Sequence, residues 1–203
     1  MSALVPVKAL DRCKSRLSEH LSGADRRRLQ VGMLDRVLGA LGNARLVSDV
    51  TVVTADPEVA ALAVSHRASV LSEPHSSGLN PAVVRGCASL AGQGARRILV
   101  LPADLPLFDG ESCDAFLAAA AAVGGYGIAP DLVRDGTNAL TFPAADSPVF
   151  HFGPGSFQRH RRQFPATAAE VRRIELALDL DRPCDLARLA EFCDASELKG
   201  ATG

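Results

Sequence analysis

The sequence of 203 residues contains no tryptophan and a single tyrosine, and aromatic residues make up only 4% of it. Because 47% of the residues are hydrophobic and alanine is prominent among them, we expect an aliphatic core. No apolar run reaches the length that spans a membrane, and no basic segment followed by an apolar one opens the chain. We therefore expect a soluble, cytoplasmic protein that does not bind membranes.

Cysteine pairs and excess charge are also lacking. The five cysteines lie far apart and include no C-x-x-C pair, which is typical of reduced cytosolic thiols and argues against a disulfide framework or a zinc site. The formal net charge of -1 argues against a broad nucleic-acid-binding surface. Lysine is rare, and two of the three lysines, Lys8 and Lys14, lie in one short N-terminal segment.

Strand-like apolar runs alternate with helical patterns over the first 122 residues. This alternation predicts an α/β fold of three layers, with a mostly parallel mixed sheet covered by helices on both faces, in a single domain over residues 1–193. After residue 125 the pattern changes, and a loop with the Asp135–Gly136 turn pair predicts an antiparallel addition. The expected strands are 3–7, 50–54, 69–72, 97–101, 126–129, 138–142 and 171–176. The expected helices are one capped by Ser22 that runs to about residue 41, one from 57, and those at 81–90, 110–122, 157–164 and 183–192. Residues 194–203 are expected to be a frayed tail.

Asp104 follows the most apolar of these strands. Residues 98–101 form an uninterrupted apolar run, typical of a strand buried on both faces, and Pro102 ends it. Open α/β sheets bind ligands just past the carboxyl ends of such strands. Asp104 has no cation beside it in the sequence, so it is either a turn or capping residue or a metal ligand.

A cationic segment follows the first strand. Lys8, Lys14 and Arg16 lie in or next to residues 9–22, and cations in such a position commonly hold phosphates because each offsets phosphate charge. An ordinary solvated loop is the alternative.

Two further segments have groups suited to ligands. Glu73 and Asn80 flank a polar loop and carry groups that can read a base edge, although Asn80 is equally suited to cap a helix. Gly153 and Gly155 expose backbone amides, and Ser156 is expected to cap the following helix. Together they predict an anion site, with a well-capped helix entry as the alternative.

Asp179 and Asp181 form a second acidic site at a junction between elements. If the sheet brings them to Asp104, the carboxylates suit Mg²⁺, a hard ion that takes oxygen ligands and keeps positions for water and phosphate. With a cationic segment and a separate anion pocket, this arrangement suggests a reaction between two phosphorylated compounds.

Short motifs at residues 5–8, 14–17, 78–80, 101–106, 136–140, 152–157 and 178–181 cover almost the whole chain. Together they resemble the phosphoenolpyruvate/2-phospho-L-lactate guanylyltransferases, which act in biosynthesis of the deazaflavin coenzyme F-420. The segments around Thr137 and Ser156 are the most specific, because the wider nucleotidyltransferase superfamily lacks them. The glycine-rich first loop of that superfamily is absent here, and Arg182 replaces a more usual threonine.

The resemblance implies a molybdenum-cofactor-guanylyltransferase-like fold and a transfer of GMP from GTP. It implies that Thr137, Gly153 and Ser156 hold the acceptor phosphate. It also implies that Mg²⁺ is held by Asp104 and the second acidic site, where Asp181 is favoured over Asp179. Nucleotide contacts are then expected from Lys8, Lys14, Arg16, Glu73 and Asn80.

In such an enzyme an acceptor phosphate oxygen attacks the α-phosphorus of GTP, and pyrophosphate leaves. Charge neutralisation by the metal at Asp104 and by Lys14 is expected to carry catalysis. No base is needed, so His151 and His160 are expected to be structural.

Phosphoenolpyruvate is the favoured acceptor, since the resemblance implies that bacterial members prefer it, and the alanine- and arginine-rich composition fits a bacterium. The alternatives are another acceptor, such as 3-phosphoglycerate or a pterin cofactor, and a non-catalytic nucleotide-binding module. A homodimer is left open.

Overall fold

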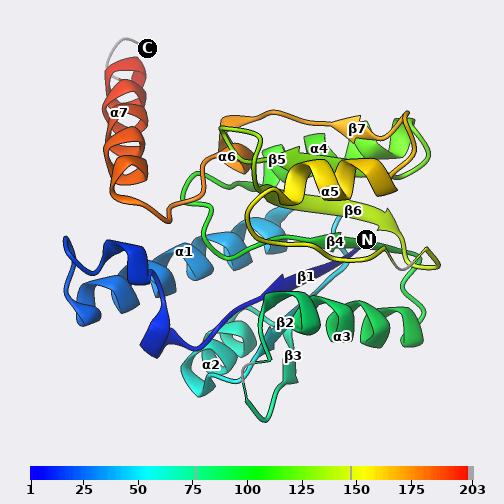
Figure 1. The fold of residues 1–203 in the computed structure, drawn as a ribbon, viewed down its shortest axis with the longest axis horizontal. Helices are drawn as coiled ribbons and strands as arrows, with labels where there is room; N and C mark the ends of the chain where they lie inside the picture. The colour runs from blue at the N-terminus through cyan, green and yellow to red at the C-terminus, as the bar shows by residue number, and fades with distance from the viewer. Residues whose placement is uncertain (76, 147, 201–203) are drawn as a thin grey trace.

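A seven-stranded sheet lies at the centre of the computed structural model, which describes residues 1–75, 77–146 and 148–200 (Figure 1). The strand order is β3-β2-β1-β4-β6-β5-β7, and in this sheet β6 runs antiparallel to both of its neighbours, whereas the other pairs are parallel. The predicted mostly parallel mixed sheet is therefore confirmed. The strands are β1 (Ser2–Pro6), β2 (Asp49–Thr54), β3 (Ser69–Ser72), β4 (Arg97–Val100), β5 (Gly127–Pro130), β6 (Thr137–Pro143) and β7 (Ala169–Glu170).

Several helices begin where the sequence supplies a cap. The Ser22 hydroxyl accepts a hydrogen bond from the backbone N–H of Asp25, and Asp56 caps the next helix in the same way. None of the helices in the described ranges is both long and apolar enough to cross a bilayer. The helices are α1 (Gly23–Asn43), α2 (Pro57–Ser65), α3 (Leu79–Gly92), α4 (Gly110–Ala122), α5 (Ser156–Gln163), α6 (Ile174–Ala177) and α7 (Pro183–Gly200), with two 3-10 turns, η1 (Leu10–Arg12) and η2 (Ser15–Leu17), between β1 and α1.

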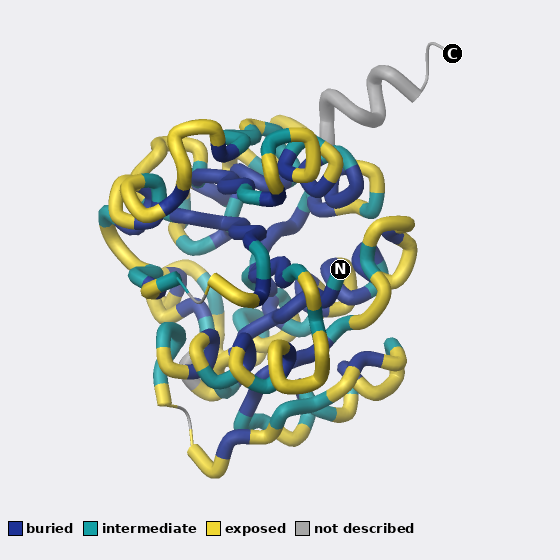
Figure 2. Tube along the Cα trace, turned by 90° about the vertical axis from the view of Figure 1, so that its right-hand side faces the viewer, coloured by how far each residue is buried: buried dark blue, intermediate teal, exposed yellow. Residues whose placement is uncertain are grey.

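Each face of the sheet packs against its own helices, because successive strand side chains point to opposite faces. Val5 and Leu99 belong to the apolar core beneath α1, α2 and α4. Leu4 and Ile98, their neighbours in sequence, belong to the core beneath α3 and α5, which lie on the near side of the sheet in Figure 1. Buried segments accordingly run through the middle of the molecule, with exposed segments around them (Figure 2).

The segment between β1 and α1 is ordered by a third, smaller apolar cluster. Leu17 of η2 is fully buried there against Met33 of α1 and Leu180, which precedes α7. Leu186 and Leu189 of α7 pack against the same cluster. The predicted cationic segment is therefore attached to the body of the protein by its own apolar residues.

α7 extends away from the body of the molecule in Figure 1. It continues to Gly200 instead of ending at the predicted residue 192, so residues 194–200 of the predicted tail are helical. Residues 201–203 of that tail lie outside the described residues.

Residues 171–176 do not form the predicted strand. β7 has only two residues, and the short helix α6 occupies the second half of the predicted range. Leu176 and Ala177 are both buried, whereas a strand with one buried face would have exposed one of them.

The predicted Ser156 cap is wrong, and the alternative of an Asn80 cap is not formed either. α3 begins at Leu79 after Gly78, so Asn80 lies inside the helix and does not cap it. α5 begins at Ser156 itself, after Gly155, which has a left-handed φ of 69°. The Ser156 hydroxyl is thereby free to point into the protein.

β6 contains a β-bulge at Asn138. Thr137 and Ala139 pair with consecutive residues of β5, so Asn138 between them has no partner in that strand. Ala139 packs beneath α1 and α4, and Leu140 packs beneath α3 and α5. Regular alternation would place Asn138 on the α5 face, yet Thr137 contacts α5, and Asn138 contacts the end of α6 and the segment after it. The extra residue therefore re-aims both side chains.

Gly86 allows α3 to approach the sheet closely. A Cβ atom at this position would lie 2.5 Å from Leu4 Cδ1 and 3.0 Å from Val53 Cγ2. We predict that Gly86→Ala lowers the free energy of unfolding by about 1–3 kcal/mol, because the buried neighbours must shift. Urea denaturation measures this loss. Gly92→Ala in the same helix is the matched control, since its Cβ would meet no atom within 4 Å, and its stability should not fall. Equal stability of the two variants would contradict the prediction.

Candidate active site

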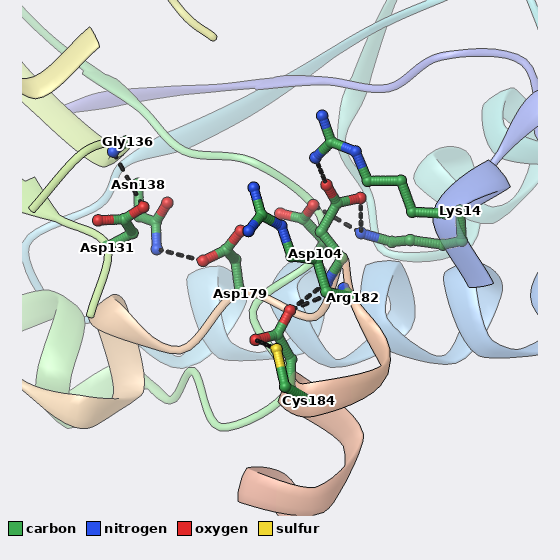
Figure 3. Close-up of polar contacts among 11 residues, drawn as sticks. Lys14, Asp104, Asp131, Gly136, Asn138, Asp179, Arg182 and Cys184 are labelled. Atoms are coloured by element: carbon green, nitrogen blue, oxygen red, sulfur yellow. Dashed lines mark hydrogen bonds and ion pairs between the residues drawn. The ribbon is translucent and has the colours of Figure 1, made fainter. Parts of the chain in front are cut away.

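The strand order reverses between β1 and β4, which is where open α/β sheets form a ligand crevice at the carboxyl ends of their strands. Lys14 comes from the segment after β1, and Asp104 comes from the segment after β4. Because β6 runs the other way, its first residues, Thr137 and Asn138, reach the same edge. Figure 3 shows Asn138, Asp179, Asp104 and Lys14 following one another across this edge.

Lys14 is the buried cation of the site. Its Nζ donates to Asp104 Oδ2 at 2.7 Å and lies 3.9 Å from Asp181 Oδ1, and its side chain is only 4% exposed. Its backbone adopts a left-handed φ of 49°, a conformation that is uncommon outside glycine and clusters at functional sites. Arg16 pairs with Asp181 from a more exposed position. Lys8 is exposed just after β1, and its contact with a phosphate stays a prediction.

A backbone hydrogen bond joins the two acidic segments. The N–H of Leu180 donates to the carbonyl oxygen of Asp104 at 3.0 Å, so Asp179 and Asp181 flank a residue that is attached to the Asp104 segment. Asp185 of α7 accepts hydrogen bonds from the backbone N–H of Asp181 at 3.1 Å and of the next residue at 2.7 Å. We call Asp104, Asp179 and Asp181 the carboxylate cluster.

Asp179 lies in an electrostatically unfavourable position. Burial, followed by the negative charge of Asp104, raises the pKa of Asp179 to about 6. Asn138 opposes this shift, because its Nδ2 donates to Asp179 Oδ1 at 3.4 Å and to the carbonyl oxygen of Ala177 at 3.1 Å. The cluster therefore disfavours a further negative charge unless a cation joins it.

The donor set fits Mg²⁺ bound together with substrate. In the described part of the chain, no three His, Cys, Asp or Glu side chains are arranged to hold a metal ion alone. One ammonium, that of Lys14, nevertheless lies within ion-pair distance of both Asp104 and Asp181. Mg²⁺ in nucleotide sites usually takes one or two carboxylates and completes its shell with water and phosphates. Ligation by Asp104, Asp179 and Asp181 stays a prediction.

The predicted acceptor residues form the second part of the site. Ser156 Oγ lies 3.3 Å from Thr137 Oγ1, and both side chains are buried. Gly153 has a φ of 124°, which glycine adopts far more readily than other residues. Two amides at the start of α5 are already bonded, because Ser156 N–H donates to the carbonyl oxygen of Gly153 and Phe157 N–H donates to that of Asp135. An anion contact from the amides of Gly153 and Gly155 stays a prediction.

Asn80 and Glu73 make contacts outside the carboxylate cluster. The Asn80 amide pairs with the backbone of Phe152, accepting from its N–H at 2.8 Å and donating to its carbonyl oxygen at 3.2 Å. Glu73 accepts from the Ser77 hydroxyl at 2.6 Å and lies 3.9 Å from the Arg85 guanidinium. Asn80 thus anchors the segment that leads to α5. Contact of either side chain with a base stays a prediction.

A cavity of about 720 Å³ lies at the opposite edge of the sheet, where Ser2, Asp49 and Arg97 line it. It contains none of the predicted site residues, and Asp49 is its single carboxylate among the lining residues. We place the active site at the other edge, because the acidic, cationic and hydroxyl groups that suit phosphate chemistry converge there.

Sequence reasoning missed the residues that support this site. Asn138 lies inside a motif already singled out, next to Thr137, and that position is the signal that was available. Gln30 is a polar residue on the apolar face of α1, and its Nε2 donates to the carbonyl oxygen of Ala103, beside Asp104, at 3.1 Å. Asp185, two residues after Pro183, accepts backbone hydrogen bonds from the turn that contains Asp181. Only the fold shows this role.

Comparisons with known proteins agree with these motifs. A family model described as "Guanylyl transferase CofC like" matches residues 1–190. A phosphoenolpyruvate guanylyltransferase from Sphaerobacter thermophilus is 39% identical over 191 residues, which cover 93% of this chain and 91% of that protein. One from Rubrobacter xylanophilus is 42% identical over 194 residues, covering 92% of each. The solved structure of a 4-diphosphocytidyl-2C-methyl-D-erythritol synthase shares the fold, with a TM-score of 0.63, 18% identity, and coverage of 93% of this chain and 95% of that one.

The raised pKa of Asp179 predicts a pH dependence of stability. Its value of about 6 in the folded protein exceeds the ordinary 3.8, so the folded state holds this proton more tightly than the unfolded state. The resulting stabilisation is fully present below about pH 4 and is lost as the pH rises through about 6. Relative to Asp179→Asn, the free energy of unfolding of the unsubstituted protein should therefore fall by roughly 1–3 kcal/mol between pH 4 and pH 7.

Urea denaturation at several pH values, in buffer containing EDTA, measures this difference. Asp135→Asn, at an exposed position, is the control for loss of a carboxylate. A difference between the Asp179 variant and the unsubstituted protein that does not change with pH would show that Asp179 is not desolvated.

Proposed function

The chain belongs to the family of CofC-like guanylyl transferases, and from that premise we propose that it transfers GMP from GTP to phosphoenolpyruvate, in biosynthesis of coenzyme F-420. Family membership makes the protein an enzyme of the nucleotidyltransferase class. The identity of the acceptor rests on the names of relatives that are 39% and 42% identical over more than nine tenths of the chain. 2-Phospho-L-lactate is the alternative acceptor within the same family.

The observation that carries the proposal is the division of one sheet edge into two parts. Lys14 and the carboxylate cluster lie at the reversal between β1 and β4, and the Thr137–Ser156 hydroxyl pair lies farther along, at the start of β6 and α5. The first part combines cations with carboxylates, as a nucleoside triphosphate and its counter-ion require. The second offers neutral hydroxyl donors, which suit a phosphate that is already ionised.

The reaction follows from this division. An oxygen of the acceptor phosphate attacks the α-phosphorus of GTP, the bond from that phosphorus to the oxygen bridging the β-phosphate breaks, and pyrophosphate leaves. Because the attacking oxygen is already ionised near neutral pH, no side chain has to remove a proton. The work of the protein is to hold two anionic substrates in line, and positioning of this kind accounts for a large part of such barriers.

Lys14 and Arg16 are the residues that we assign to the triphosphate. Both lie on η2 or at its start, and both already contact carboxylates of the cluster, so they neutralise charge where the substrates meet. Asp104 and Asp181 would hold Mg²⁺, with Asp179 as the alternative second ligand. When bound, the ion supplies positive charge to the phosphoryl oxygens as negative charge builds up on them.

A purified-protein assay tests the proposal. GTP, ATP, CTP and UTP are each combined with phosphoenolpyruvate, 2-phospho-L-lactate or 3-phosphoglycerate, and pyrophosphate release is measured. We expect release with GTP and phosphoenolpyruvate to exceed that of the other combinations. Preference for another acceptor would overturn the acceptor assignment, and release with no combination would support the non-catalytic alternative.

We predict that Asp104→Asn lowers turnover by on the order of a hundredfold, which is typical of losing one group that stabilises transition-state charge. The thermal unfolding midpoint should change little, because the amide oxygen can still accept from Lys14. Steady-state pyrophosphate release at saturating Mg²⁺ measures the effect. Asp35→Asn on α1 is the matched control, since its side chain is 60% exposed and pairs with His66, outside the carboxylate cluster. Turnover close to that of this control would remove Asp104 from the catalytic residues.

A further inference from the structure

A buried histidine, His160, contacts the Thr137–Ser156 pair. His160 is on α5, one helical turn after Ser156, and its Nδ1 lies 3.0 Å from Thr137 Oγ1. His160 and Ser156 are each 1% exposed and Thr137 is 6% exposed, so these three polar side chains bond to one another inside the protein. A buried polar group of this kind is costly unless it is paired.

The backbone determines which nitrogen of His160 carries the proton. The N–H of His151 donates to His160 Nε2 at 2.8 Å, so Nε2 accepts and cannot carry a hydrogen in the neutral ring. The hydrogen is therefore on Nδ1, which donates to Thr137 Oγ1. Burial, followed by the charges of His151 and Arg159, lowers the pKa of His160 to about 4, which keeps the ring neutral near pH 7.

A count of hydrogens then shows how many the network leaves for a ligand. Nδ1 of His160 and the hydroxyl groups of Thr137 and Ser156 together carry three hydrogens, and the two contacts among them use two. The third hydrogen is on Thr137 or on Ser156, according to which hydroxyl donates to the other. In the described part of the chain, no other side-chain or backbone acceptor bonds either hydroxyl. The trio therefore always has one hydroxyl hydrogen left over for a ligand.

We propose that His160 is a positioning residue for the acceptor: by donating to Thr137 Oγ1, it makes the Thr137–Ser156 pair a hydrogen-bond donor toward a group that has only lone pairs, such as a fully ionised phosphate oxygen. This inference rests on the proposed function, which places the acceptor phosphate at these two hydroxyls. It goes beyond that function by stating that the pair keeps one hydroxyl hydrogen for the ligand. If the hydrogen were on Nε2 instead, the pair would donate one hydrogen to the ring and retain none for the ligand.

The tautomer of His160 can be measured in the unsubstituted protein, so this test does not depend on a variant that folds. Long-range ¹H–¹⁵N NMR correlations distinguish protonated from unprotonated ring nitrogens. At pH 7 we expect Nδ1 to be protonated and Nε2 to be unprotonated. Protonation of Nε2, alone or together with Nδ1, would overturn the proposal.

Two substitutions separate the two bonds of the ring. Asn at position 160 places a donor near the position of Nδ1, whereas Gln places its amide near the position of Nε2. We expect His160→Gln to raise the Kd for phosphoenolpyruvate about tenfold, since a bond that orients a charged contact is lost, and His160→Asn to raise it by less than about threefold. The Kd for GTP should be unchanged in both variants.

A double-mutant cycle with Thr137→Val completes the test, because the residues interact only through the hydroxyl. In the Thr137→Val background, His160→Gln should change the Kd for phosphoenolpyruvate by less than about twofold. Suppose instead that both His160 variants raise the Kd for phosphoenolpyruvate equally, and that these increases multiply with the increase caused by Thr137→Val. His160 would then be merely structural, and its positioning role would be overturned. If Thr137→Val itself leaves this Kd unchanged, the acceptor site of the proposed function is misplaced. If Thr137→Val weakens binding and His160→Gln does not, the role of His160 alone is wrong.

Discussion

Mutual repulsion among carboxylates is the constraint on which the site depends. Asp104, Asp179 and Asp181 are brought to one sheet edge, and Lys14 is the buried counter-charge that lies within ion-pair distance of Asp104 and Asp181. The pairing has a conformational cost, because Lys14 takes up a left-handed backbone to reach them. A strained backbone of this kind persists only where the surrounding structure stabilises it. Here Leu17, which is buried in the small apolar cluster, fixes the η2 turn that follows Lys14.

The reversed direction of β6 gives the edge its second half. A seventh parallel strand would have begun at the far side of the sheet, whereas β6 begins at the edge where β1 and β4 end. Its bulge at Asn138 then sends Thr137 toward α5 and Asn138 toward Asp179. One irregular residue in one strand thus supplies a hydroxyl to the acceptor side and an amide to the carboxylate side.

Much of the fold follows from local patterns in the sequence. The strand at residues 69–72 and the helix at 110–122 have the predicted bounds, because turn residues and caps mark their ends. The strand predicted at residues 171–176 is wrong, because the elements that pack around Leu176 and Ala177 bury both of them. The local spacing of apolar residues does not show that packing. The predicted start of α5 is wrong for a related reason. The left-handed backbone of Gly155 and the burial of Ser156 determine where the helix begins, and the capping preference of serine does not.

The site was predicted in its charged residues and missed in its supporting ones. Carboxylates and lysines past strand ends can be recognised from type and position, as Asp104 and Lys14 were. The contact of His160 with Thr137 joins residues 23 positions apart across two elements, and its meaning depends on which ring nitrogen the backbone occupies. Neither the contact nor the protonated nitrogen can be read from composition or spacing. The sequence alone therefore predicted only a structural role for His160.

The small apolar cluster of Leu17, Met33 and Leu180 supports part of the active site separately from the cores of the sheet. It lies apart from the two large cores, yet it supports both the turn that carries Lys14 and the turn that carries Asp181. Regions with few buried contacts open at lower free energy than core strands, often as one cooperative unit. The cation and its carboxylate partner would then come apart together on warming while the sheet is still folded, and activity would be lost before the fold melts.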